Sequence, residues 1–228
     1  MFPISKTIKQ IFKKSTQMKY LSLLIVLMWT IGYEAESKSF LMKGQIIYAN
    51  DTVDVTFNIP VKKISEEINF EKLQLKVTYF DSNHKKITLK SNQAKEIRFQ
   101  DGSHMIRMVS RRNSLMLGSI YTMDTTIFLK IEIDGNLKLF TYYGSSGGMY
   151  GSAGGMPIMT GGSITTVQTY ILQKGDGPLI KPYKLTFRSD MKKYLSDCPA
   201  LIEKIDSKEF RNADIESIVL FYNGECGK

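Results

Sequence analysis

Alternation of apolar and polar residues is the dominant pattern between residues 44 and 187. It is clearest at 53–59 (VDVTFNI) and in two runs at 127–133 and 137–141 that flank the turn residues Asp134-Gly135-Asn136. A period of two is typical of strands with one buried face. Shorter runs of the same kind lie at 46–48, 73–79, 87–89, 97–99, 105–108, 164–172 and 183–187. Strands of this length and spacing predict a mainly antiparallel sheet, arranged as a sandwich, a curled sheet or a partly open barrel.

Two segments between the predicted strands carry turn or loop signals. Asp101-Gly102 separates the runs at 97–99 and 105–108, which is a hairpin signal. Residues 144–150 (GSSGGMY) are nearly repeated at 151–157 (GSAGGMP), within a glycine-rich segment that extends to 163. Because glycine loses more conformational freedom on ordering than any other residue, we expect 144–163 to be a loop between two strands.

The period changes from two to that of a helix in the last part of the chain. Ile215, Ile218, Val219 and Tyr222 follow the i, i+3, i+4, i+7 spacing of one apolar helix face. Three short helices are predicted, the second with Pro199 in its first turn, and the predicted N-caps are Ser189 or Asp190, then Asp197, then Asn212. Asn223-Gly224 is a helix-stop signal. The predicted fold class is therefore α+β, with a β-rich domain at 36–187 and a helical tail at 188–228.

The positive charge is concentrated at the N-terminus. The chain has a net charge of +9, and five lysines precede the apolar run at 21–33 (LSLLIVLMWTIGY). A basic segment, a short apolar run and a polar stretch are typical of a secretory signal, and the alternative is a retained membrane anchor. Residues 1–35 are thus predicted to be a signal peptide or anchor, with membrane contact through 20–33 in the second case. Met18 is an alternative start, because the apolar run follows it closely.

This arrangement predicts export to the periplasm or cell envelope. The residues after 35 carry 26 basic and 21 acidic groups, which is a mildly basic surface and argues against nucleic-acid binding. The only two cysteines, Cys198 and Cys226, both lie in the tail. In an oxidising compartment we expect them to form a disulfide, since an antiparallel pair of short helices brings their positions together. The alternative is two unpaired thiols.

The search for catalytic and metal-binding patterns yields no candidate residues. His84 and His104 each lie beside a predicted turn, and the chain has no further histidine. Residues 144–148 match the GxSxG pattern of serine hydrolases, but no histidine follows them to act as a base. The glycine-rich segment holds Met149, Met156 and Met159, and thioethers suit Cu(I), which leaves a copper-binding loop as a minor alternative. We predict no catalytic residue, no metal ligand and no cofactor.

A run of cations precedes and enters the first helix of the tail: Lys181, Lys184, Arg188, Lys192 and Lys193. We interpret it as a solvated face, with contact to an anionic surface or lipid as the alternative. The predicted function is a non-enzymatic cell-envelope protein, a β-rich binding or structural module, whose partner is an unknown envelope protein or surface. The alternatives are an enzyme whose site is not recognisable from sequence and the copper-binding envelope factor.

The tail resembles that of a group of uncharacterised exported proteins of Bacteroidetes. The shared pattern is an aromatic residue in a first helix, an S-D-C-P-x-L segment, a second aromatic residue and a final Y-N-x-x-C. In this chain these are Tyr194, residues 196–201 (SDCPAL), Phe210 and residues 222–226 (YNGEC). The segments 87–99 and 128–143 are similar to that group's strand pair and hairpin. The resemblance implies an exported β-rich protein with a cysteine-paired tail, and it implies no activity.

Overall fold

The structure is a computed structural model that describes residues 38–63, 65–115, 125–146, 152–153, 156–157 and 165–227. The predicted signal peptide or anchor at 1–35 and most of the glycine-rich segment lie outside these residues. The chain divides into two units, Met1–Ser37 and Lys38–Lys228, and the second is described below. Within the described residues, no helix combines the length and the apolar composition that crossing a bilayer would require.

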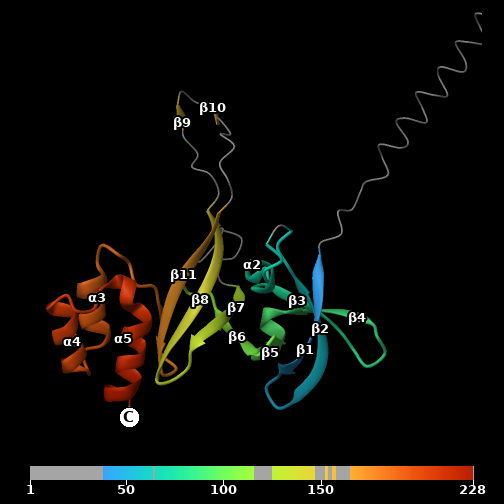
Figure 1. Ribbon diagram of the computed structural model, residues 1–228, viewed down its shortest axis with the longest axis horizontal. Helices are drawn as coiled ribbons and strands as arrows, with labels where there is room; N and C mark the ends of the chain where they lie inside the picture. The colour runs from blue at the N-terminus through green and yellow to red at the C-terminus, as the bar shows by residue number, and fades with distance from the viewer. Residues whose placement is uncertain are drawn as a thin grey trace, which may run out of the picture. The chain divides into compact units, whose positions relative to one another are not determined.

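One antiparallel sheet dominates the described residues (Figure 1). Its strands follow the order β12-β11-β8-β7-β6-β5-β1-β2-β3-β4. They are β1 (Ser39–Ile47), β2 (Thr52–Pro60), β3 (Lys76–Phe80), β4 (Lys86–Lys90), β5 (Glu96–Asp101), β6 (His104–Arg112), β7 (Thr126–Ile133), β8 (Leu137–Ser146), β11 (Thr165–Lys174) and β12 (Leu179–Ile180). The sheet is not closed, because β12 and β4 each have one neighbour. The predicted α+β class with a mainly antiparallel sheet is confirmed.

The hairpins β5–β6 and β7–β8 follow the predicted turns. β1 pairs with β2, β5 with β6 across Gly102, and β7 with β8. Gly102 has φ 58°, the left-handed region that such a turn requires. β8 pairs with β11 from Leu137↔Lys174 to Ser146↔Thr165, so the glycine-rich segment connects two paired strands, as predicted. The loop prediction is wrong for its first three residues, 144–146, because they belong to β8. A short pair, β9 (Ser152–Ala153) and β10 (Met156–Pro157), lies within that segment.

Two predicted strands are wrong in part or in full. The run at 73–79 begins as a strand only at Lys76, because α2 (Phe70–Leu73) precedes it and the Asn69 side chain caps that helix. The predicted strand at 183–187 is absent. The chain pairs earlier, at β12, and Pro182 has no amide hydrogen with which to continue the ladder. Phe187 then begins a helix.

The tail contains three α-helices with short 3₁₀ and π segments. They are α3 (Phe187–Tyr194), α4 (Pro199–Asp206), η3 (Asn212–Asp214), α5 (Ile215–Phe221) and the π-helical turn η4 (Tyr222–Cys226), while η1 (Ser91–Gln93) lies in the sheet domain. The predicted stripe of the last helix is buried throughout, from Ile215 to Tyr222. This burial confirms the helical periodicity.

The predicted caps are wrong in detail. Thr186 precedes α3, and the Ser189 hydroxyl donates to the Thr186 carbonyl from within the helix. Cys198 precedes α4, with Pro199 as its first residue, so Asp197 is available for other contacts. η3 occupies the position where Asn212 was expected to cap. The helix also continues past Asn223 instead of stopping there, because the Asn223 side chain bonds to the sheet.

The core is divided among three apolar clusters. The first lies among β1 to β7 and includes the edge-to-face pair Phe57–Phe99, with ring centroids 6.0 Å apart. The second joins the tail helices to one face of β8 and β11, through Leu137, Leu139 and Leu172. The third covers the opposite face, where Phe140 is buried. Successive strand residues point to opposite faces, so β8 contributes to two clusters. Figure 1 shows α3, α4 and α5 grouped beside β8 and β11.

One asparagine joins the end of the tail to the start of β8. Asn223 accepts a hydrogen bond from the Leu137 amide at 2.8 Å and donates one to the Leu137 carbonyl at 2.9 Å. Gly135, in the β7–β8 turn, leaves room for this contact. A Cβ atom there would lie 2.5 Å from Asn223 Nδ2, and the glycine φ of 159° is one that side chains disfavour. The tail is thus fixed to the sheet by hydrogen bonds as well as by apolar packing.

Candidate functional site: a basic groove on the helical tail

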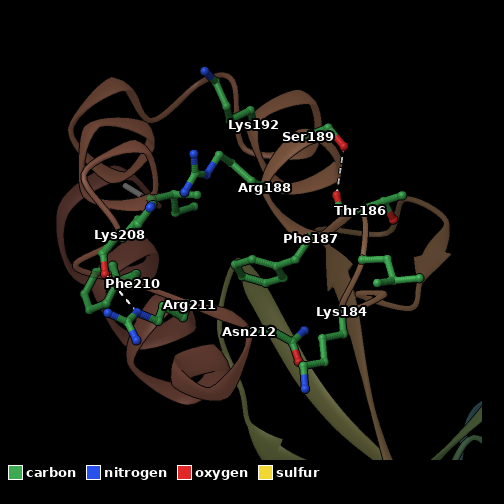
Figure 2. Close-up of a pocket in the computed structure, with 12 residues that line it drawn as sticks. Lys184, Thr186, Phe187, Arg188, Ser189, Lys192, Lys208, Phe210, Arg211 and Asn212 are labelled. Atoms are coloured by element: carbon green, nitrogen blue, oxygen red, sulfur yellow. Dashed lines mark hydrogen bonds between the residues drawn. The ribbon is translucent and has the colours of Figure 1, made fainter.

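A groove of about 900 Å³ lies on the tail, between α3 with the segment that precedes it and the region from α4 to η3 (Figure 2). We call it the basic groove. It is lined by Lys184, Leu185, Thr186, Phe187, Arg188, Ser189, Lys192, Ile205, Lys208, Phe210, Arg211 and Asn212. These residues come from three consecutive parts of the tail, so the groove exists only when the tail is folded.

The inner surface of the basic groove is apolar and firmly packed. Phe187 and Ile205 are buried members of the second core cluster, and Phe210 packs against the same cluster. Phe210 also makes an edge-to-face contact with Phe221, at 5.9 Å between ring centroids. Side chains held in this way lose little further freedom when a ligand binds. The groove is therefore largely formed before any ligand arrives.

The charged part of the basic groove is entirely cationic. Five of its residues are Lys or Arg and none is acidic. Only Lys192 has an ion pair, to Asp206 at 2.6 Å. Lys184, Arg188 and Lys208 form no ion pair within the described residues. Figure 2 shows Arg188 extending from α3 and Lys208 from the α4 side. Unpaired cations around an apolar surface raise the local concentration of anions and can bind phosphate or carboxylate oxygens.

Lys208 has an unusual backbone conformation. It follows the α4 C-cap residue Ser207 and has φ 67°. The left-handed conformation at this position is common in helix ends, but glycine usually adopts it. A glycine at this position would avoid the strain but would bring no side chain to the basic groove, whereas the Lys208 side chain lines it. Strain of this kind persists where the surrounding structure imposes it, and it often marks a functional position.

The disulfide predicted between Cys198 and Cys226 is present, with 5.6 Å between the two Cα atoms. Cys198 is fully buried, at the residue before α4, and Cys226 is the last residue of η4. Asp197 lies beside this bond. It accepts hydrogen bonds from the Tyr222 hydroxyl at 2.5 Å and from Lys174 Nζ at 3.0 Å. The disulfide and the Asp197 contacts hold the helices that form the basic groove.

These contacts shift the pKa values of both partners. Burial disfavours the ionised form of Asp197, but the hydrogen bonds from Tyr222 and Lys174 outweigh it and hold the Asp197 pKa below its ordinary value. Burial and the neighbouring Asp197 raise the pKa of Tyr222 to about 12. At neutral pH the pair is a carboxylate that accepts a hydrogen bond from a neutral phenol. It stabilises the tail and does not prepare Asp197 to donate a proton.

A second charged cluster lies in the sheet. Glu96 is buried and accepts from Arg98 Nε at 2.6 Å and Arg107 Nε at 2.7 Å, and Arg107 also pairs with Asp134 at 2.6 Å. Burial opposes ionisation of Glu96 and Asp134, yet hydrogen bonds, from Arg107 above all, lower the pKa of both carboxyls. A general acid near neutral pH needs a raised pKa instead. This cluster therefore joins β5 and β6 to the turn between β7 and β8.

The residues considered for chemistry do not meet in the described structure. His84 and His104 are exposed and lie beside turns, and the described residues contain no group of three or more His, Cys, Asp or Glu that could hold a metal ion. Ser146, in the GxSxG match, pairs with Thr165 inside the sheet, whereas a nucleophile elbow requires a strand-to-helix turn. Met149 and Met159 lie outside the described residues, and the side chain of Met156 in β10 is not among those described.

Comparison with known proteins identifies no relative: no family, no curated protein and no solved structure matches the chain.

The basic groove combines cations that the sequence places in one run with two that it does not. Lys184, Arg188 and Lys192 belong to the predicted basic run, while Lys208 and Arg211 come from the segment after α4. The sequence around Ser207 and Lys208 gives no signal that Lys208 adopts a left-handed conformation. The sequence therefore did not predict that Lys208 and Arg211 line the basic groove.

Proposed function

We propose that this chain is an exported, non-enzymatic binding module of the cell envelope, and that its basic groove binds an anionic group. The single observation that supports the binding role most strongly is the groove itself. Its apolar inner surface is packed in advance, and its five cations face no lining carboxylate. Arg and Lys donors beside an apolar surface favour phosphate or carboxylate oxygens, to which Arg188 can donate two parallel hydrogen bonds.

The disulfide supports an extracytoplasmic location for this module. Cys198 and Cys226 are paired, and the described residues contain no other cysteine. Stable disulfides form in oxidising compartments and are rare where glutathione keeps thiols reduced. The basic, apolar N-terminal sequence agrees with export. Cell fractionation with thiol labelling of the denatured, unreduced protein tests the location. Recovery in the cytosol with two reactive thiols would refute it.

The acid groups of the described residues favour binding over catalysis. Every carboxyl with a shifted pKa, namely Glu67, Glu96, Asp134 and Asp197, has a lowered one. Sites of acid–base catalysis usually push the pKa values of two neighbouring groups apart and keep one raised. The lowered values arise from Lys, Arg and Tyr partners that belong to structural contacts.

Titration of the purified full chain with inorganic pyrophosphate, followed by calorimetry, tests anion binding directly. We expect Arg188→Gln to weaken binding severalfold, since an Arg–phosphate pair of this exposure contributes about 1 kcal/mol. Lys193→Gln is the matched control, because it removes a cation from the same helix outside the groove. If both variants lose the same affinity for pyrophosphate, net charge alone accounts for the effect. If the unaltered chain does not bind pyrophosphate, the anion site is refuted.

A further inference from the structure

The segment that leads into α3 exposes two large apolar side chains beside the basic groove. Leu185 is 99% exposed and Tyr183 is 56% exposed. Lys184 lies between them and Lys181 two residues before Tyr183, and we call residues 181–185 the rim. Lys184 and Leu185 line the basic groove, while Lys181, Tyr183 and Lys184 line a neighbouring hollow of about 250 Å³. The rim therefore lies between the basic groove and the neighbouring hollow.

The rim has the features of a membrane-interface segment. It has no helix or strand over 181–183, so its side chains can adjust to a soft surface. Tyrosine is enriched where one end of a side chain meets lipid and the other meets water. Lys181 Nζ lies 5.3 Å from the centre of the Tyr183 ring, which places a cation next to that ring. Lysine can keep its ammonium group at headgroup level while its carbon chain lies against lipid.

We propose that the rim docks the tail onto a phospholipid bilayer that carries anionic headgroups. This inference rests on the proposed function, because it identifies the bilayer as the source of the anion. Leu185 enters the boundary between headgroups and acyl chains, and Tyr183 lies at headgroup level. Lys181, Lys184 and Arg188 bind the phosphates, with Lys208 and Arg211 behind them in the basic groove. Basic residues near an anionic membrane surface each add to the attraction.

The charge pattern favours a bilayer over a free anion or a protein partner. A free phosphate would engage the cations and leave Leu185 in water, although a fully exposed leucine gains from leaving it. A protein partner would need acidic groups around a pocket shaped for one protruding leucine. A fluid anionic bilayer supplies both the charge and the apolar environment without a fitted pocket. The unpaired Lys184 and Arg188 beside Leu185 are complementary to such a surface.

Amine footprinting of the full chain on vesicles tests the inference. Acetylation rates are measured by mass spectrometry with vesicles of phosphatidylcholine alone and with phosphatidylcholine mixed with phosphatidylglycerol. Because the N-terminal apolar run can attach the chain to both kinds of vesicle, the experiment measures the protection of individual lysines and not attachment. We expect Lys181 and Lys184 to be labelled severalfold more slowly on the anionic vesicles, and Lys86, exposed on the edge strand β4, to keep its rate.

The variant Leu185→Ser separates insertion from charge. Leu185 is 99% exposed, so we expect the folded state to be unaffected. The protection of Lys184 should fall by about tenfold, because no leucine leaves water when this variant binds the vesicle. Equal rates on both vesicle types, or unchanged protection in Leu185→Ser, would overturn the inference. Protection by inorganic pyrophosphate but not by anionic vesicles would also overturn it, while leaving the proposed anion-binding function intact.

Discussion

Replacement of Lys208 by glycine is expected to stabilise the protein and weaken anion binding at the same time. Lys208 has φ 67° at the end of α4. A side chain in the left-handed region costs about 1–2 kcal/mol, and glycine gives back about 0.5–1 kcal/mol through its greater freedom in the unfolded chain. The net gain for Lys208→Gly is therefore about 1 kcal/mol, which corresponds to about 2–4 °C in Tm for a unit of this size.

The same substitution removes a cation from the basic groove. Lys208 forms no ion pair within the described residues, so its loss leaves no buried carboxylate unpaired. An exposed cation contributes up to about 1 kcal/mol to an ionic contact, so the pyrophosphate dissociation constant should rise by about threefold to fivefold. Stability and binding should thus move in opposite directions, as expected where strain is kept for function.

Urea unfolding and calorimetric titration of three proteins test this reasoning. Lys208→Ala keeps a Cβ atom and removes the charge, so it should bind like Lys208→Gly and unfold like the unaltered protein. The difference between the two variants isolates the backbone strain. If Lys208→Gly is less stable than Lys208→Ala, the left-handed strain is not real. If both variants bind pyrophosphate as tightly as the unaltered protein, Lys208 has no part in the anion site.

Three further predictions concern the contacts that hold the fold. Reduction of the Cys198–Cys226 disulfide should destabilise the protein by about 3–4 kcal/mol on the chain-entropy model, because 28 residues separate the cysteines; unchanged urea midpoints with and without reductant would contradict this. Glu96→Gln should cost about 1–3 kcal/mol at pH 7, since two arginines lose their carboxylate. The folded pKa of Glu96 lies below its unfolded value, so its contribution to stability is complete above about pH 5 and is lost as pH falls through the folded pKa. The urea midpoint of the variant should therefore fall less with decreasing pH than that of the unaltered protein. The same fall in both proteins would refute the assignment. Asn223→Ala should cost about 1–3 kcal/mol by leaving the Leu137 amide and carbonyl without their partners, which thermal unfolding can measure against the exposed-turn control Asn83→Ala.

The sheet was predictable because strand alternation is a local signal. The hairpins at 97–108 and 127–141 follow directly from a period of two around turn residues. The helical stripe ending at Tyr222 was predictable for the same reason. The disulfide followed from only two cysteines sharing one helical tail. In each case the residues that decide the structure are close together in the chain.

The caps and the basic groove were not predictable because distant contacts decide them. Asp197 is a good N-cap residue by type, yet Tyr222 and Lys174 bind its carboxylate. Asn223 is a good helix-stop residue, yet Leu137 binds its amide across 86 positions of sequence. The short strand expected at 183–187 has the correct alternation, but Pro182 and the helix at Phe187 exclude it. At Asp197 and Asn223 a polar partner far away in sequence overrode local preference, whereas at 183–187 the neighbouring proline and helix did so.

The apolar cluster between the tail and β8 has a consequence for the order of folding. Leu137 and Leu139 are buried in a cluster whose members extend to Tyr222 at the end of the tail. During synthesis, β8 therefore emerges long before the helices that cover it, and contacts so distant in sequence form slowly. Until then, one face of β8 and β11 is uncovered and prone to association.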